Sequence, residues 1–207
     1  MENLNFFSAV GNTPLVELVH SSPKRGVRLF AKLEGNNPSG SIKDRVASYI
    51  IRSGEERGEL IPGQTIVEAS TGNMAIALAA AAKQRGYKMR AVVPPQVAPG
   101  IPDLLTLFGV EIKWMEPRLG MLGPIEEAQR LAAENGWWFS QQFANAANVQ
   151  AHYETTGPEI LSALPQVDAF VAGIGTGGTV TGVGRRLKEK NPDTVIVGVE
   201  PKFGERL

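Results

Sequence analysis

The chain has 207 residues, of which 43% are hydrophobic and 20% are charged, so its composition is that of an ordinary globular protein and not of a disordered one. Its 21 basic and 21 acidic residues give a formal net charge of zero, which argues against a general nucleic-acid binder. The lack of cysteine excludes disulfides, thiolate metal sites and a cysteine nucleophile.

The start of the chain and its apolar stretches bear on localisation and partners. Residues 1–5 lack the basic and apolar regions of a signal peptide, and the apolar stretch 75–82 is too short to cross a membrane. We therefore expect a soluble, cytoplasmic protein without membrane or nucleic-acid partners. His20 and His152 show no metal-ligand spacing, so we expect no metal site.

The first segment that could carry chemistry is the turn-rich stretch 36–45. Ser41 and Asp44 are spaced like a capping box, which predicts a helix with Lys43 in its first turn. The positive end of the helix dipole should lower the pKa of Lys43, and such a lysine suits Schiff-base chemistry. An exposed lysine beside an acid is the alternative that this segment leaves open.

The middle of the chain alternates strands with helices. We predict strands at 65–69, 88–94 and 110–116, helices at 73–85, 103–108 and 124–135, and an extended segment at 137–141. Gly86 and Gly136 follow two of these helices as stops, and the proline-rich stretch 94–102 predicts a surface loop.

A second candidate loop, Ser70-Thr71-Gly72-Asn73-Met74, lies between the first of these strands and its helix. Free backbone N–H groups at a helix start bind anions, so a carboxylate or a phosphate would fit there. Simple capping of the helix is the alternative.

The last part of the chain contains a third candidate loop. Thr156 and Glu159 predict a capping box, and after it we predict a strand at 169–173, a helix at 180–190 and a strand at 194–199. The loop Gly173-Ile174-Gly175-Thr176-Gly177-Gly178-Thr179 lets the backbone approach a ligand closely. It lacks the ending of a P-loop and the acidic residue of a dinucleotide fingerprint, so a phosphate cradle and tight helix packing both remain open.

The alternation of strands and helices predicts an α/β fold with parallel strands. A parallel sheet normally continues beyond a strand such as 194–199 and is covered on both faces. We therefore expect part of this domain to be absent from the sequence.

Taken together, the motifs resemble one family. They are Gly11-Asn12-Thr13-Pro14-Leu15, the stretch from Lys32-Leu33-Glu34 through Asn37-Pro38 to Lys43-Asp44-Arg45, and Gly175-Thr176-Gly177-Gly178-Thr179. They look like cysteine synthase, the O-acetylserine sulfhydrylase group of fold-type II pyridoxal-phosphate enzymes. Stretches 33–38 and 151–159 look closest to the cysteine synthase B branch, and the resemblance covers roughly the family's first two thirds.

The resemblance implies two parallel-sheet, three-layer α/β domains, as in the tryptophan synthase β-like fold. Residues 37–145 would form a smaller, mobile domain. Residues 1–36 and 146–207 would form the larger, phosphate-binding domain, without its C-terminal part. A homodimer is implied for the complete protein.

The resemblance also implies a site. Lys43 matches the lysine that bonds to pyridoxal 5′-phosphate and later transfers a proton, and Asn73 matches the residue that hydrogen-bonds the cofactor's 3-hydroxyl oxygen. The phosphate-binding positions correspond to Gly175, Thr176, Gly177, Gly178 and Thr179. The substrate-carboxylate positions correspond to Ser70, Thr71, Gly72, Met74 and Gln142.

The implied reaction is β-replacement, in which sulfide or thiosulfate converts an activated serine such as O-acetylserine into cysteine or S-sulfocysteine. Its partners are a small amino acid and a sulfur donor. The chain departs from the family at Met74 and Ala75, where threonine and glycine are usual, and at 98–102. These departures leave open a catalytically impaired relative with a binding or regulatory role and a pyridoxal-phosphate enzyme for another amino acid. A non-enzymatic nucleotide-binding module is the remaining alternative.

Overall fold

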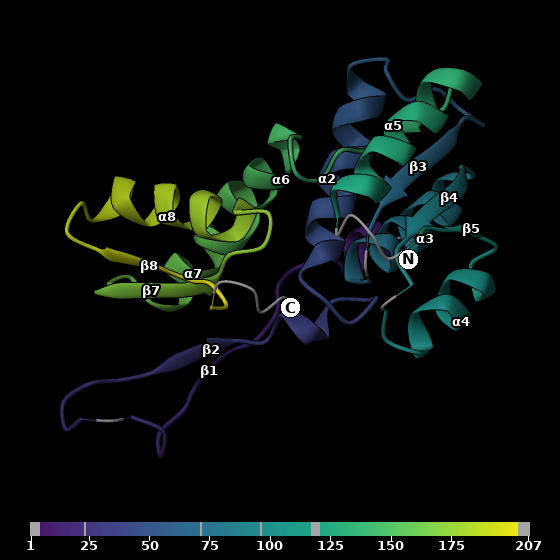
Figure 1. Ribbon diagram of the computed structural model, residues 1–207. Helices are drawn as coiled ribbons and strands as arrows, with labels where there is room; N and C mark the ends of the chain where they lie inside the picture. The colour runs from purple at the N-terminus through teal and green to yellow at the C-terminus, as the bar shows by residue number, and fades with distance from the viewer. Residues whose placement is uncertain (1–4, 23, 71, 96, 117–120, 203–207) are drawn as a thin grey trace.

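The computed structural model describes residues 5–22, 24–70, 72–95, 97–116 and 121–202 (Figure 1). The predicted alternation of strands and helices is confirmed. The helices are α1 (Phe6–Ala9), η1 (Glu34–Asn36), α2 (Lys43–Glu56), α3 (Asn73–Arg85), α4 (Gly100–Leu107), α5 (Leu122–Asn135), α6 (Ala146–Ala151), η2 (His152–Thr156), α7 (Gly157–Ala163) and α8 (Gly178–Lys190). No helix of the described ranges is long and apolar enough to cross a membrane.

A four-stranded sheet forms the centre of the first region. Its strands follow the order β5 (Glu111–Trp114), β4 (Lys88–Val93), β3 (Thr65–Ala69) and β6 (Trp138–Phe139). All neighbouring strands are parallel, as predicted. Because successive side chains of a strand point to opposite faces, Ile66 joins the core under α2 and α3, whereas Val67 joins the core under α5. The result is a three-layer region with both faces of the sheet covered.

A second, two-stranded sheet pairs β7 (Ala169–Gly173) with β8 (Val195–Val199) in parallel. Phe170 and Ile196 pack with Ile160 of α7 and Val183 and Leu187 of α8. The opposite face of this sheet is exposed and apolar. Its exposed side chains are Val171, Val195, Val197 and Val199.

A short antiparallel hairpin of β1 (Leu15–Glu17) and β2 (Phe30–Lys32) extends away from the two sheets, as Figure 1 shows. No strand was predicted in this part of the chain. With three residues each, these strands are too short to carry a readable alternation of apolar and polar residues.

Several predicted boundaries move by a few residues. Helix α4 begins at Gly100 rather than at 103, so part of the predicted proline-rich loop is helical. Helix α8 begins at Gly178 rather than at 180, which takes the end of the glycine-rich loop into its first turn. Both helices begin with residues that have low helix propensity and carry no apolar periodicity.

Both predicted capping boxes are wrong. Thr156 does not start a helix, because α6, the π-helix η2 and α7 follow one another without a break and the Thr156 backbone is helical. At α2, Ser41 Oγ accepts a hydrogen bond from the Lys43 N–H at 3.2 Å, but Asp44 turns to the backbone N–H of Ser39 at 2.7 Å. The reciprocal bond that defines a capping box is therefore missing.

Candidate active site

The glycine-rich loop connects the carboxyl end of β7 to the amino end of α8. Gly177 has a φ of +79°, a backbone conformation that favours glycine. A Cβ added at Gly175 or Gly177 would meet no atom within 4 Å among the described residues, so this part of the loop is open to a ligand. At the start of α8 the Thr181 N–H donates to the Gly177 carbonyl, and the Gly178 N–H points to Thr176 Oγ1 at 3.4 Å. N–H groups at such a helix start bind an anion.

The glycines that follow have a different role. A Cβ at Gly178 would lie 2.0 Å from Asn148 Oδ1, and a Cβ at Gly182 would lie 2.4 Å from Val149 O. Neither distance is tolerable, so these two positions let α8 pack directly against α6. The sequence left a cradle and close packing as alternatives, and the geometry is compatible with both: the loop is open at its start and closely packed at its end.

Lys43 is the first residue of α2, as predicted. Burial lowers the pKa of its amine, so the predicted direction is confirmed, although the cause is desolvation and not the helix dipole. Within the described residues the amine has no hydrogen-bond or ion-pair partner. Its charge contributes to lowering the pKa of His152, which touches Thr179 of the glycine-rich loop. Lys43 therefore lies near the same loop with a free, partly desolvated amine.

The loop between β3 and α3 presents Asn73 on the surface, at the first position of the helix. Ser70 is buried and its Oγ accepts from the Gly72 N–H at 3.2 Å. Met74 is only 2% exposed and its side chain packs in the apolar core. Thr71 lies outside the described residues. A carboxylate at this helix start would therefore meet backbone N–H groups rather than the Met74 side chain.

Gln142 lies beside this loop but its amide is already engaged. Its Nε2 donates to Glu68 Oε1 at 2.9 Å and to the Ala69 carbonyl at 3.2 Å. Glu68 is fully buried on β3 and also accepts from the Ser140 hydroxyl. Burial raises the pKa of Glu68 to about 7, although both hydrogen bonds favour the carboxylate. Glu68 is not among the site residues predicted from the sequence; the signal for it was a lone acidic residue in an otherwise apolar strand.

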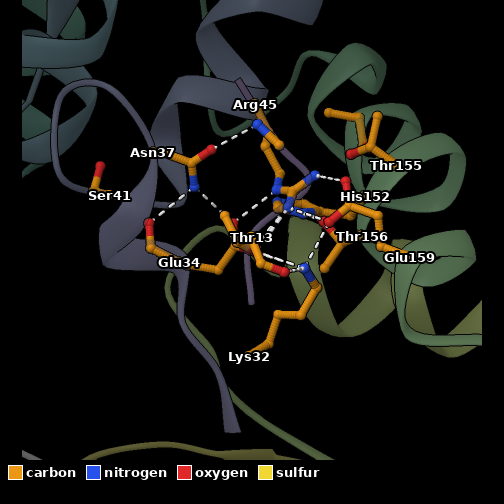
Figure 2. Close-up of polar contacts among 12 residues, drawn as sticks. Thr13, Lys32, Glu34, Asn37, Ser41, Arg45, His152, Thr155, Thr156 and Glu159 are labelled. Atoms are coloured by element: carbon orange, nitrogen blue, oxygen red, sulfur yellow. Dashed lines mark hydrogen bonds and ion pairs between the residues drawn. The ribbon is translucent and has the colours of Figure 1, made fainter. Parts of the chain in front are cut away.

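A polar cluster joins the N-terminal segment to α2 and α7 (Figure 2). Arg45 has a fully buried side chain whose Nε lies 2.7 Å from Glu34 and whose Nη1 lies 2.6 Å from Glu159. Lys32 binds Glu159 at 2.6 Å, and the Thr13 hydroxyl donates to Glu34. Two cations thus face two carboxylates, so the cluster is electrically balanced.

This polar cluster explains several of the family-like motifs without assigning them a role in chemistry. Gly11 has a φ of +89°, and a Cβ there would lie 3.0 Å from both Arg45 and Glu159. The Asn12 N–H donates to Glu159 Oε1 at 3.0 Å, and Asn37 accepts from the Gly11 N–H at 2.9 Å. These motif residues position the start of α2, on which Lys43 lies.

The residues present fit pyridoxal phosphate. They provide an open glycine loop with threonine hydroxyls for a phosphate, a lysine with a lowered pKa and no partner in the described part of the chain, and an exposed amide at Asn73. Among the described residues no group of three His, Asp or Glu side chains is arranged to hold a metal ion.

Comparison with known proteins places these features in context. The model of the family described as "Pyridoxal-phosphate dependent enzyme" matches residues 6–207. The chain is 43% identical to cysteine synthase B of Pseudomonas aeruginosa, over 96% of the chain and 67% of that protein. It is 39% identical to cysteine synthase B of Escherichia coli, over 96% of the chain and 66% of that protein.

Solved structures give the same result for the fold. The structure of O-ureido-L-serine synthase superposes with a TM-score of 0.89 at 37% identity, over 96% of this chain and 63% of that one. The cysteine synthase of Entamoeba histolytica superposes with a TM-score of 0.88 at 38% identity, over 95% of this chain and 60% of that one. The chain thus spans about two thirds of the length of the relatives it matches.

Proposed function

Because the chain belongs to the pyridoxal-phosphate dependent enzyme family, with the fold-type II α/β architecture, we propose that it carries out β-replacement in cysteine biosynthesis. The substrate would be an activated serine, O-acetylserine or a close analogue. Loss of the α-proton and of acetate from the β-carbon would come first, and sulfide would then bond to the β-carbon and a proton return to the α-carbon, which yields cysteine. The observation that carries this proposal is Lys43, a half-buried lysine with a lowered pKa whose charge acts on His152, the partner of Thr179 in the open, glycine-rich loop.

The cofactor would be held at three points. Gly175, Thr176, Gly177, Gly178 and Thr179 would bind its phosphate through backbone N–H groups and hydroxyls. Lys43 would bond to it through Nζ, and Asn73 would hydrogen-bond its 3-hydroxyl oxygen. When bound, pyridoxal phosphate supplies an electron sink for the electrons left at the substrate's α-carbon when a proton departs.

The remaining chemistry belongs to the protein. The lowered pKa of Lys43 favours the neutral form of its amine, which would act as a base at the α-carbon. The N–H groups at the start of α3, together with Ser70, Thr71 and Gly72, would orient the substrate carboxylate. Met74 would contribute through its backbone, since its side chain is buried in the core. Gln142 would add a contact only after its amide leaves Glu68.

The sulfur donor is the finer part of the proposal. The stretches 33–38 and 151–159 resemble the B branch, and the chain is 43% and 39% identical to two proteins named cysteine synthase B. We propose thiosulfate as a second donor, with S-sulfocysteine as its product. Comparing product formation from sulfide and from thiosulfate, with O-acetylserine in both cases, tests this choice.

The experiment that tests the function combines a chemical label with a matched variant. Borohydride treatment of the protein loaded with pyridoxal phosphate should label Lys43, as peptide mapping would report. Lys43→Ala should lower cysteine formation by about a hundredfold or more, because the base and the cofactor bond are both lost. Lys83→Ala, at an exposed lysine on α3, is the control. A label on Lys83 or Lys32, or full activity of Lys43→Ala, would contradict the proposal.

A specific observation favours a second candidate, namely another amino acid as substrate. The Met74 side chain adds no hydroxyl to the carboxylate loop, and Ile101 of the divergent stretch 98–102 packs close to Gly72. The chain is also 37% identical to O-ureido-L-serine synthase. Measuring kcat/KM for O-acetylserine against serine and O-phosphoserine separates the candidates; a preference for either of the latter would favour the second.

A further inference from the structure

Two side chains of the continuous helical segment formed by α6 and η2 contact the glycine-rich loop. Asn148 lies on α6 and His152 follows it by four residues, at the start of the π-helix η2. Both are buried, at 3% and 0% exposure. Asn148 Nδ2 lies 2.8 Å from Thr176 Oγ1, and His152 Nε2 lies 3.2 Å from Thr179 Oγ1. Each threonine hydroxyl of the loop therefore has one nitrogen partner from this helix.

The direction of the first hydrogen bond follows from a third partner. Asn148 Nδ2 is also 2.9 Å from the Gln142 carbonyl oxygen, which can only accept. The Asn148 atom is therefore the amide nitrogen, and it donates to Thr176. The Gly178 N–H points to the same hydroxyl oxygen at 3.4 Å. With two donors at its oxygen, the Thr176 hydroxyl has its own proton available for another acceptor.

His152 is neutral. Burial lowers its pKa to about 3, and the positive charges of Lys43 and Arg45 contribute to this. A neutral imidazole has one N–H group and one acceptor nitrogen. Its Nδ1 lies 3.0 Å from Thr156 Oγ1 while its Nε2 faces Thr179. One of these two threonines must therefore donate to the ring and the other must accept from it.

We propose that His152 carries its proton on Nε2, so that Asn148 and His152 both donate to the loop threonines and both hydroxyl protons face a phosphate monoester bound in the loop. The inference deepens the proposed function and rests on it for the identity of the ligand. In the other tautomer the Thr179 hydroxyl would donate its proton to the ring. Only the lone pairs of the Thr179 oxygen would then face the anion, and that contact is repulsive. Asn148 and His152 are thus positioning residues that turn two hydroxyls into donors.

The tautomer can be measured directly, without activity. The chain has only two histidines, and His20 is exposed, so a ¹⁵N-detected NMR spectrum of the ring nitrogens contains one buried signal and one internal reference. We expect His152 to show a protonated Nε2 and an unprotonated Nδ1 between pH 5 and 8. A protonated Nδ1 would overturn the inference, whether or not the protein binds the cofactor.

A binding experiment then tests whether the two donors act on the phosphate. The probes are pyridoxal phosphate and pyridoxal, and the readout is Kd from fluorescence titration. His152→Leu and Asn148→Leu should each weaken pyridoxal phosphate binding about fivefold to tenfold, which corresponds to one hydrogen bond. Pyridoxal should be affected less than about twofold. His152→Gln, which can still donate, should recover most of the loss. Tyr153→Phe is the matched control, because the Tyr153 hydroxyl binds Glu189 and not the loop.

The outcomes separate the inference from the proposed function. An equal loss of pyridoxal and pyridoxal phosphate in the leucine variants would assign a merely structural role and overturn the inference. Absence of pyridoxal phosphate binding in the unmodified protein would overturn the proposed function, and the NMR tautomer would still decide the hydrogen-bond direction. If the leucine variants do not fold, His152→Gln and the NMR measurement on the unmodified protein decide.

Discussion

The two parallel sheets have similar strands but different surroundings. β3 reads Thr-Ile-Val-Glu-Ala and is buried almost throughout, between α2 and α3 on one face and α5 on the other. β8 reads Val-Ile-Val-Gly-Val, yet Ile196 packs against α7 and α8 while its three valines are exposed. Continuous apolar strands are typical of sheets covered on both faces. The comparison teaches that burial here is set by what covers the strand and not by the strand's own residues.

The largest effect is expected from disrupting the polar cluster that joins the N-terminal segment to α2 and α7. Arg45→Met should lower the free energy of unfolding by about 3–5 kcal/mol, because two carboxylates in a mostly buried site would then share Lys32 as their one remaining cation in the cluster. Urea denaturation measures this change. Arg28→Met, which breaks an exposed ion pair with Glu17, is the control and should have a much smaller effect. Equal effects of the two variants would show that the polar cluster contributes no more to stability than an exposed ion pair does.

The next effect concerns Glu68, an acidic residue buried on β3 of the sheet that helices cover on both faces. The pKa of Glu68 is raised from 4.5 to about 7, so the folded state binds more protons than the unfolded state between these pH values. The stability contributed by neutral Glu68 is therefore fully present below about pH 4.5 and is lost as the pH rises through 7. The loss amounts to about 3 kcal/mol.

This pH effect is measured against Glu68→Gln, whose side chain does not titrate. The difference in unfolding free energy between the unmodified protein and Glu68→Gln should fall across this window. The comparison with the variant is needed because His152, whose pKa is lowered to about 3, acts in the opposite direction as the pH falls below 6.5. A difference that stays constant from pH 4.5 to 7 would contradict the raised pKa.

A smaller effect compares the same substitution in the two sheets. Val67 is fully buried on β3, whereas Val171 on β7 is 60% exposed. Val67→Ala should destabilise by about 2 kcal/mol, since it removes buried methyl groups. Val171→Ala should change stability by less than about 0.5 kcal/mol. If Val171→Ala proves as costly, then its face is covered in solution.

The last test, limited proteolysis of the unmodified protein, requires no substitution and probes the domain boundaries. We propose that residues 37–145 form a smaller domain of their own and that 1–36 with 146–207 form the larger one. The doubly covered sheet should then leave a resistant fragment of roughly residues 37–145, with the ends cut first. Mass spectrometry of the fragments gives the boundaries. A first cleavage within β3 or β4 would contradict this division.

The sequence predicted best the elements that local chemistry determines. Helix 73–85 and its stop at Gly86 were placed correctly, because an alanine-rich run ends at a glycine that adopts φ +77°. The helix before Gly136 ended as predicted for the same reason, with φ +65° at the glycine. The direction of the pKa shift of Lys43 was also predicted, although its cause was not.

The features that sequence reasoning missed depend on partners distant along the chain. Thr156 and Glu159 have the spacing of a capping box, but Glu159 turns to the N-terminal segment and Thr156 to His152. Glu68 receives its raised pKa from strands and helices packed around it. No local pattern contains this information, because it arises only when the chain folds back on itself.

The polar cluster also has a consequence for the order of folding. The hydrogen bond from Asn12 to Glu159 joins residues 147 positions apart, with the whole four-stranded sheet between them. Such non-local contacts form slowly. During synthesis the hairpin and α2 leave the ribosome long before Glu159, so Arg45 first has Glu34 as its only carboxylate partner in the cluster. Glu159 completes the charge balance only when the chain after the intervening sheet has been made, so the cluster cannot close before that sheet has been synthesised.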